Sequence, residues 1–91
     1  MNWVWDKKKA RINLAKHDVF FEIAVFVFDD PRQLSEPDPH PDDDRWRTIG
    51  MVDATTLLVV HTIADDHGPG RIISARKATR RERKRYEQFR H

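Results

Sequence analysis

Apolar residues along this chain fall into short periodic blocks that are separated by charged and turn-forming residues. A spacing of three or four residues is typical of an amphipathic helix, whereas strict alternation is typical of a half-buried strand. The blocks predict the following order of elements: strand 2–5, helix 7–16, helix 20–28, short strand 32–35, strand 45–52, strand 56–64, strand 71–77 and a helix that begins near residue 80.

The block from Phe20 to Phe28 fits two structures. Its inward stripe at helical spacing would be Phe21, Ala24, Val25 and Phe28, but Val-Phe-Val-Phe also alternates like a buried strand. The length of the block favours the helix. Asp29-Asp30-Pro31 should end it, because a proline disfavours helical geometry at the residue before it.

The segment 36–44 contains three prolines and five acidic residues, and no apolar side chain to bury apart from proline rings. It predicts an exposed loop, and a mobile flap is the alternative. The segment 56–64 is apolar on both faces, which is typical of a central strand, and 71–77 should return beside it as an antiparallel neighbour.

The last strand and the last helix meet at a cationic corner. Alternation places Arg71 and Arg76 on opposite faces of the strand, and only a bulge or a strong twist would bring them together. Thr79 and Glu82 have the spacing of a capping box, which predicts that the helix begins at Arg80. Arg76, beside this junction, is therefore the best single candidate for a functional residue.

This order of elements predicts an α+β fold in one domain over residues 1–91. An antiparallel sheet of four to five strands would be packed with two N-terminal helices and a C-terminal helix. The helices should lie mainly on one face of the sheet, which leaves the other face open.

Charge is distributed unevenly along the chain. The net charge is +2, but residues 71–91 carry nine basic and two acidic groups, whereas residues 31–70 carry three and eight. Such polarity is typical of a surface that binds a polyanion. Cysteine is absent, so disulfides and thiolate metal sites are excluded, and without a signal peptide or a membrane span the expected compartment is the cytoplasm.

Basic residues are the main candidates for chemistry. On the strands they could hold a phosphodiester and stabilise the charge that builds during its cleavage, and on the last helix they could attract phosphates. A histidine could act as general acid or base. Each group also has a purely structural explanation. The last helix could simply be a solvated surface helix, the histidine could be a hydrogen-bonded structural residue, and the cations at the end of the first helix could be there because the helix dipole favours them. The candidates on the strands are Arg45, Arg47, His61, Arg71 and Arg76; those at the end of the first helix are Lys16 and His17; those on the last helix are Arg80, Arg81 and Tyr86.

Several motifs, taken in order, resemble the BrnT toxin family: Trp5-Asp6, Asn13-Leu14, Lys16-His17, Phe28-Asp29-Asp30-Pro31, Arg45-Trp46-Arg47-Thr48-Ile49-Gly50 and the stretch from Arg71 to Arg83. The most specific is Ile-Ser-Ala-Arg-Lys-Ala-Thr at 73–79. The resemblance implies a RelE-like ribonuclease toxin of a type II toxin–antitoxin pair. It also implies a ribbon-helix-helix antitoxin, BrnA, through which the complex binds operator DNA.

The hypothesis for function is RNA cleavage without a metal or other cofactor, in which a 2′-hydroxyl attacks the adjacent phosphate. Arg76 and Arg71 would bind the phosphate with help from Arg45, and Lys16, His17 or His61 would exchange protons. Base or backbone contacts of the RNA would fall to Arg47, Arg80, Arg81 and Tyr86. The alternatives are a non-catalytic module that binds nucleic acid or an acidic protein, and a degenerate toxin that keeps only its antitoxin.

Overall fold

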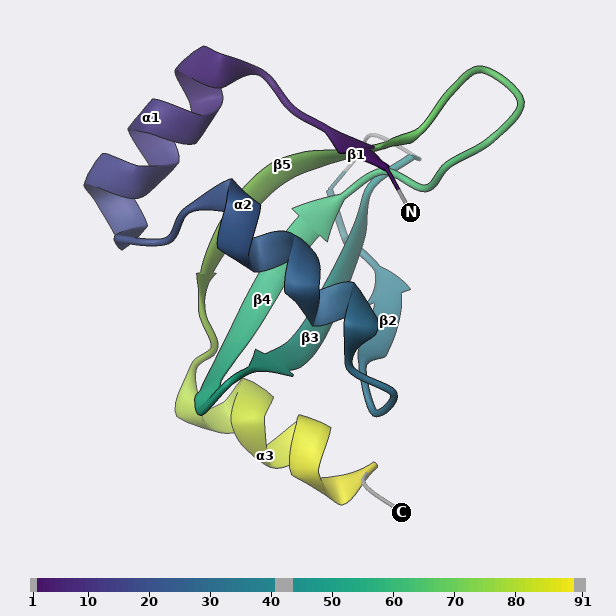
Figure 1. Ribbon diagram of the computed structural model, residues 1–91. Helices are drawn as coiled ribbons and strands as arrows, with labels where there is room; N and C mark the ends of the chain where they lie inside the picture. The colour runs from purple at the N-terminus through teal and green to yellow at the C-terminus, as the bar shows by residue number, and fades with distance from the viewer. Residues whose placement is uncertain (1, 41–43, 90–91) are drawn as a thin grey trace.

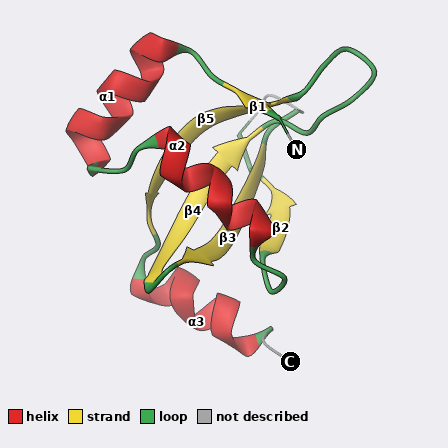
Figure 2. Ribbon diagram, viewed as in Figure 1, coloured by secondary structure: helices red, strands yellow, loops and turns green. Residues whose placement is uncertain are grey.

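The computed structural model describes residues 2–40 and 44–89. Its centre is a five-stranded sheet with the strand order β1-β5-β4-β3-β2, and helices lie against it (Figures 1 and 2). The elements are β1 (Trp3–Val4), α1 (Lys7–His17), α2 (Phe21–Ala24), the 3₁₀ helix η1 (Val25–Asp29), β2 (Leu34–Pro37), β3 (Trp46–Val52), β4 (Thr55–His61), β5 (Gly70–Lys77) and α3 (Arg80–Gln88).

The predicted α+β class and the predicted four to five strands are confirmed, but the predicted sheet was antiparallel throughout and the direction of β1 differs. The strands β2 to β5 pair antiparallel in sequence order, but β1 pairs parallel to β5. The chain between β1 and β5 is long enough to make the crossover that a parallel pair requires. The sheet is therefore mixed.

One face of the sheet, here called the helix-covered face, lies under α1, α2 and η1 (Figure 1). Asp6 caps α1 by accepting hydrogen bonds from two backbone N–H groups, and Asp18 ends it in the left-handed conformation. Phe21, Val59 and Ile72 are fully or almost fully buried in the core of this face. The helix predicted over 7–16 is confirmed.

The predicted helix over 20–28 is also confirmed, but its second half is wound more tightly than an α-helix. A 3₁₀ turn has three residues instead of 3.6, so side chains three apart align. Phe21, Ala24 and Val27 accordingly all face the core and are fully buried. The predicted stripe missed Val27 because it assumed an α-helical period throughout.

The opposite face, here called the α3 face, carries a second apolar cluster. Ile49, Leu58 and Val60 pack there with Tyr86 of α3. The helix α3 lies at one end of the sheet, away from the β4–β5 connection (Figure 1). The prediction of helices mainly on one face is therefore right for α1 and α2, while α3 covers one end of the other face.

Two of the predicted strands have bounds that differ from the structure by two or three residues. The short strand lies at Leu34–Pro37 instead of 32–35, so the predicted loop begins two residues later than expected, and residues 41–43 of that loop lie outside the described part of the chain. The strand predicted over 56–64 ends at His61, where its register with β5 changes. Pairing with the neighbouring strand sets where each of these strands begins or ends, and this pairing cannot be deduced from the sequence pattern.

A bulge in β5 changes which residues share a face. Val60 is paired with Ser74, but His61 is paired with Ile72, so Ile73 is an extra residue in β5. Ile72 and Ala75 consequently both enter the core of the helix-covered face, although they are three residues apart. The prediction that simple alternation holds along this strand was wrong.

Candidate functional site

The bulge places Arg71 and Arg76 on the same face of β5. Ile72, next to Arg71, and Ala75, next to Arg76, both point into the core of the helix-covered face. Because adjacent residues of a strand point to opposite faces, both arginines point to the α3 face. Arg47 of β3 lies on that face as well, since its cross-strand neighbour Val60 belongs to the α3-face cluster. The structure thus places three of the arginines predicted from the sequence on one face of the sheet.

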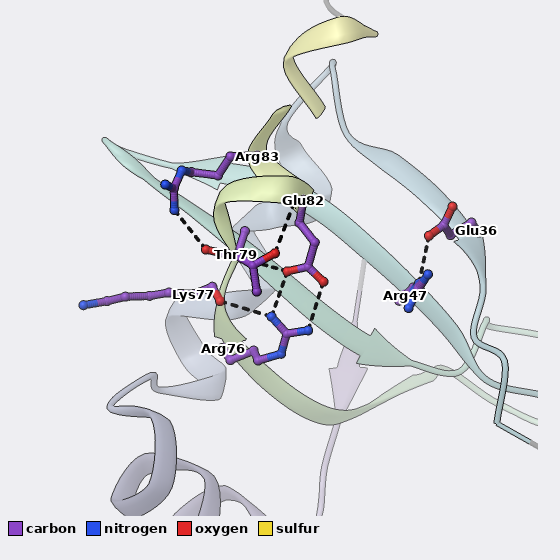
Figure 3. A network of polar contacts seen from close by, with 8 residues as sticks. Glu36, Arg47, Arg76, Lys77, Thr79, Glu82 and Arg83 are labelled. Atoms are coloured by element: carbon purple, nitrogen blue, oxygen red, sulfur yellow. Dashed lines mark hydrogen bonds and ion pairs between the residues drawn. The ribbon is translucent and has the colours of Figure 1, made fainter. Parts of the chain in front are cut away.

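Arg76 is held in place by α3. Its Nη1 and Nη2 atoms donate to the two carboxylate oxygens of Glu82 at 2.8 and 3.0 Å, and Nη1 is also 3.3 Å from the carbonyl of Lys77 (Figure 3). Glu82 completes the predicted capping box with Thr79. The hydrogen bond from Arg76 is the main reason that the pKa of Glu82 falls to about 2. Because the side chain of Arg76 is still 35% exposed, its remaining N–H groups can meet a ligand.

A second carboxylate orients two more arginines. Glu36 of β2 accepts a hydrogen bond from Nε of Arg47 at 2.8 Å and another from Arg85 of α3. The bond from Arg85 is the largest cause of the lowered pKa of Glu36. Glu36 thus orients both guanidinium groups, and its hydrogen bond with Arg47 uses the Nε atom of that arginine.

Arg45 lies just before β3 and forms an ion pair with Asp38, with Nε 3.5 Å from Oδ2. The backbone also joins the two residues, since the N–H of Asp38 donates to the carbonyl of Arg45 at 3.0 Å. Arg45 is therefore tied to the end of the β2–β3 hairpin, beside Arg47.

The spacing of these arginines indicates the size of a suitable ligand. Ile49, Leu58 and Arg76 form one cross-strand row, and Arg47 lies two residues along β3 from Ile49. From ordinary strand geometry, the backbones of Arg47 and Arg76 are roughly 12 Å apart, and those of Arg71 and Arg76 roughly 15 Å. Such a row suits an extended polyanion that crosses the strands better than it suits one small anion.

The end of α1 reaches the edge of β5. Lys16 and His17 line a groove of about 180 Å³ together with Ile73 and Ser74 of β5. Ser74 is on the α3 face, two residues before Arg76 on the same strand. The two candidates at the end of the first helix thus lie beside the strand that carries Arg76.

His61 lies apart from these residues. It is on the helix-covered face, only 4% exposed, with its ring edge-on to Trp3 and Phe28. Its Nδ1 atom is 2.8 Å from the carbonyl of Thr62, so this nitrogen donates, and Nε2 accepts from the hydroxyl of Thr48 at 2.7 Å. Burial lowers the pKa of His61, which favours the neutral form. A satisfied imidazole in this position has the contacts of a structural residue.

The remaining candidates lie on α3. Tyr86 is 3% exposed, and its hydroxyl donates to Asp30 at 2.5 Å, so the ring anchors the helix and presents no free face to a base. Arg80 and Arg81 lie at the beginning of α3 and are exposed. Of the three, only these two arginines are placed where an external ligand can reach them.

Sequence reasoning missed one carboxylate of this face, Glu36, and one serine, Ser74. Glu36 was assigned to an exposed loop, yet the β2–β3 register places it directly opposite Arg47. The alternation of Leu34 and Glu36 was the available signal, but four residues are too few to distinguish a strand from a loop. Nothing in the sequence pattern singled out Ser74, because its interest comes from lying beside Lys16 and His17 in the folded protein.

We also searched the described residues for a metal-binding cluster and for a membrane-spanning helix. Within residues 2–40 and 44–89, no group of three or more histidine, aspartate or glutamate side chains is arranged to hold a metal ion. No helix in these ranges is both long and apolar enough to cross a membrane.

A small mixed sheet with an arginine row on one face and a lysine–histidine groove at its edge has the charge expected of a surface that binds a polyanion. Comparison with protein families is more specific, since residues 5–82 match the family described as "Ribonuclease toxin, BrnT, of type II toxin-antitoxin system". The chain belongs to this BrnT family, and an RNA substrate and an antitoxin partner follow from the family description. A search of curated proteins found no match.

Proposed function

We propose that the protein cleaves RNA on the α3 face, beside the edge of β5, without a metal ion. The observation that carries this proposal is the convergence of two separate elements on one strand. The end of α1 supplies Lys16 and His17 to the groove at Ser74, and β5 supplies Arg76 two residues further on.

The chemistry needs few protein groups, because RNA contains its own nucleophile. The 2′-hydroxyl attacks the adjacent phosphorus, the bond to the 5′-oxygen breaks, and the products are a cyclic phosphate and a 5′-hydroxyl. Arg76 stabilises the negative charge that builds on the phosphate oxygens, with its plane fixed in advance by Glu82. His17 removes or supplies the proton, and Lys16 adds positive charge.

The rest of the arginine row positions the substrate. Arg71 binds a phosphate on one side of the reacting group, and Arg47 and Arg45 bind the strand as it crosses the sheet. Arg80 and Arg81, exposed at the beginning of α3, guide the RNA to this face by their charge.

The biological part of the proposal follows from the family. The protein acts in the cytoplasm in a RelE-like manner, inhibits translation and growth, and is neutralised by a BrnA-like ribbon-helix-helix antitoxin that brings the complex to operator DNA. A short open reading frame for such a protein beside the gene would support this part.

Replacing Arg76 tests the site. Arg76→Ala should lower the rate of RNA cleavage in excess EDTA by about 100-fold, since one charge-stabilising donor is lost. Arg11→Ala removes a positive charge from the side of α1 that lines a depression with Trp5 and Phe21, and it should leave cleavage unchanged. Normal cleavage by folded Arg76→Ala would remove this residue from the mechanism.

Loss of Arg76 also leaves Glu82 unpaired, so the fold must be checked by circular dichroism. If Arg76→Ala unfolds, the double variant Arg76→Ala/Glu82→Gln removes the unpaired charge and allows the same assay. A protein that binds RNA in a salt-dependent way but never cleaves it, and that does not arrest growth, would instead be a non-catalytic binding module.

A further inference from the structure

An exposed apolar stripe runs along α2 and η1, on the side of these helices that faces away from the core. Its members are Phe20, Ile23 and Phe26, which are 53%, 46% and 52% exposed. Ile23 at the end of α2 and Phe26 in η1 are three residues apart, like the buried Ala24 and Val27, and Phe20 is the N-cap residue of α2. Soluble proteins seldom leave several large apolar side chains exposed side by side unless they bind something.

The stripe lines two neighbouring grooves. One groove has a volume of about 670 Å³ and the other about 230 Å³, and both are lined by Ile23, Val52 and Asp53. Phe26 and Met51 extend the apolar lining in the larger groove, and Phe20 and Leu57 extend it in the smaller. A groove of this kind accommodates apolar side chains from one face of a partner segment.

The charges at the edges of the two grooves are mainly negative. Asp18, Asp29, Asp30 and Asp53 contribute carboxylates to the lining, whereas Arg32 and Lys77 are the cations there. The α3 face, by contrast, carries Arg47, Arg71, Arg76 and Arg85 against Glu36 and Glu82. The two surfaces therefore attract ligands of opposite charge.

We propose that this surface, Phe20, Ile23 and Phe26 with the two grooves, binds a basic amphipathic segment of the antitoxin. Apolar side chains of that segment enter the grooves, and its lysines or arginines meet Asp18, Asp29 and Asp53. The inference rests on the proposed function, because it names the surface by which the toxin recognises its antitoxin. The carboxylates disfavour RNA at this surface, and the cationic α3 face remains the place for RNA.

The test is antitoxin affinity, measured by calorimetry with the purified protein and the purified cognate antitoxin. Ile23→Glu and Phe26→Glu should each weaken binding by at least about 100-fold, because a charge would enter the centre of an apolar contact. Ile63→Glu makes the same change at another exposed apolar residue, 50% exposed in the β4–β5 connection, and should change affinity less than threefold.

RNA cleavage is measured in parallel for the same variants. Ile23→Glu should cleave RNA like the unaltered protein but resist inhibition by the antitoxin. If the protein cleaves no RNA at all, the proposed function fails, but the affinity measurement still decides the present inference.

Three outcomes would overturn the inference. Antitoxin affinity could be the same in both stripe variants as in the unaltered protein. The variants could dissociate a homodimer, seen by light scattering, without changing antitoxin affinity, in which case the stripe binds a second copy of this chain. They could weaken RNA binding while antitoxin affinity stays the same, in which case the stripe is a surface for RNA.

Discussion

A single buried asparagine closes the exposed edge of β5. Among the described residues, β1 pairs with Gly70 and Arg71 alone, and the rest of β5 has no partner strand on that side. Asn13 of α1 takes the place of one, since its Oδ1 accepts from the N–H of Ala75 at 3.0 Å and its Nδ2 donates to the carbonyl of Ala75 at 2.9 Å. A further bond from Nδ2 to the carbonyl of Val19 ties in the beginning of α2. This amide therefore positions the end of α1, which carries Lys16 and His17.

Asn13→Ala should lower the free energy of unfolding by about 2–4 kcal/mol, because two buried backbone groups of Ala75 would lose their partner. Urea denaturation followed by circular dichroism measures this change. Lys8→Ala, at an exposed position of the same helix, should change stability by less than about 0.5 kcal/mol. Equal stability of Asn13→Ala and the unaltered protein would mean that the edge of β5 needs no such partner.

Glycine is required at two places where elements approach closely. A Cβ atom at Gly50 would lie 2.9 Å from Cγ1 of Val27, and one at Gly70 would lie 2.4 Å from the ring of Trp3. These contacts allow η1 to lie directly on β3 and allow Trp3 to cover β5. The ring of Trp3 in turn stacks on Phe28, with centroids 4.1 Å apart.

At the scale of elements, α3 is fastened to the sheet at both of its ends. Glu82 joins its first turn to β5 through Arg76, and near the other end Tyr86 donates to Asp30 while Arg85 binds Glu36. Asp30 also accepts from the backbone of Met51 and of Arg32. Burial opposes ionisation of Asp30, but these hydrogen bonds outweigh it and lower the pKa. The helix thus connects the strands that carry the arginine row.

The stability that Glu82 contributes should depend on pH. Its pKa is about 2 in the folded protein, below its ordinary value of 4.5, so the ionised form stabilises the fold. This contribution is complete above about pH 4.5 and is lost as the pH falls towards 2. Glu82→Gln should therefore cost about 1–2 kcal/mol at pH 7 and almost nothing at pH 2, measured by thermal or urea unfolding.

Glu87→Gln serves as the control for this prediction, because Glu87 is exposed on the same helix. Its stability should follow that of the unaltered protein at every pH. A cost of Glu82→Gln that is the same at pH 2 and pH 7 would show that the carboxylate does not stabilise the fold through its charge.

At the scale of the whole molecule, two surfaces differ in character, although the larger groove of the apolar one extends to Met51 and Tyr86 beside α3. The α3 face is cationic, and the stripe on α2 and η1 is apolar with carboxylates around it. This difference in charge is the basis of the proposal that the RNA and the antitoxin bind to different surfaces.

The cationic face predicts a definite dependence of RNA affinity on salt. A single-stranded RNA with 2′-O-methyl groups lacks the nucleophile and is not cleaved. Its dissociation constant can therefore be measured from about 50 to about 300 mM salt. Arg71→Ala should reduce the slope of log affinity against log salt by about 0.7. Arg11→Ala removes the same charge from the other side of the molecule and should leave the slope unchanged, and an equal reduction in both variants would mean that binding follows net charge alone.

The sequence by itself determined the helices, most of the strands, the capping box and the family, because these depend on local periodicity and on short motifs. It also singled out Arg47, Arg71 and Arg76, since long charged side chains on strands are not needed for folding. Only the tertiary structure decided which residues share a face. The bulge at Ile73 and the pairing of Glu36 with Arg47 arise from contacts between different strands, and the 3₁₀ winding of η1 is a further feature that the sequence pattern did not predict. The same contacts buried His61 and Tyr86 and brought Lys16 and His17 to the edge of β5, because burial and proximity depend on packing and not on the order of residues.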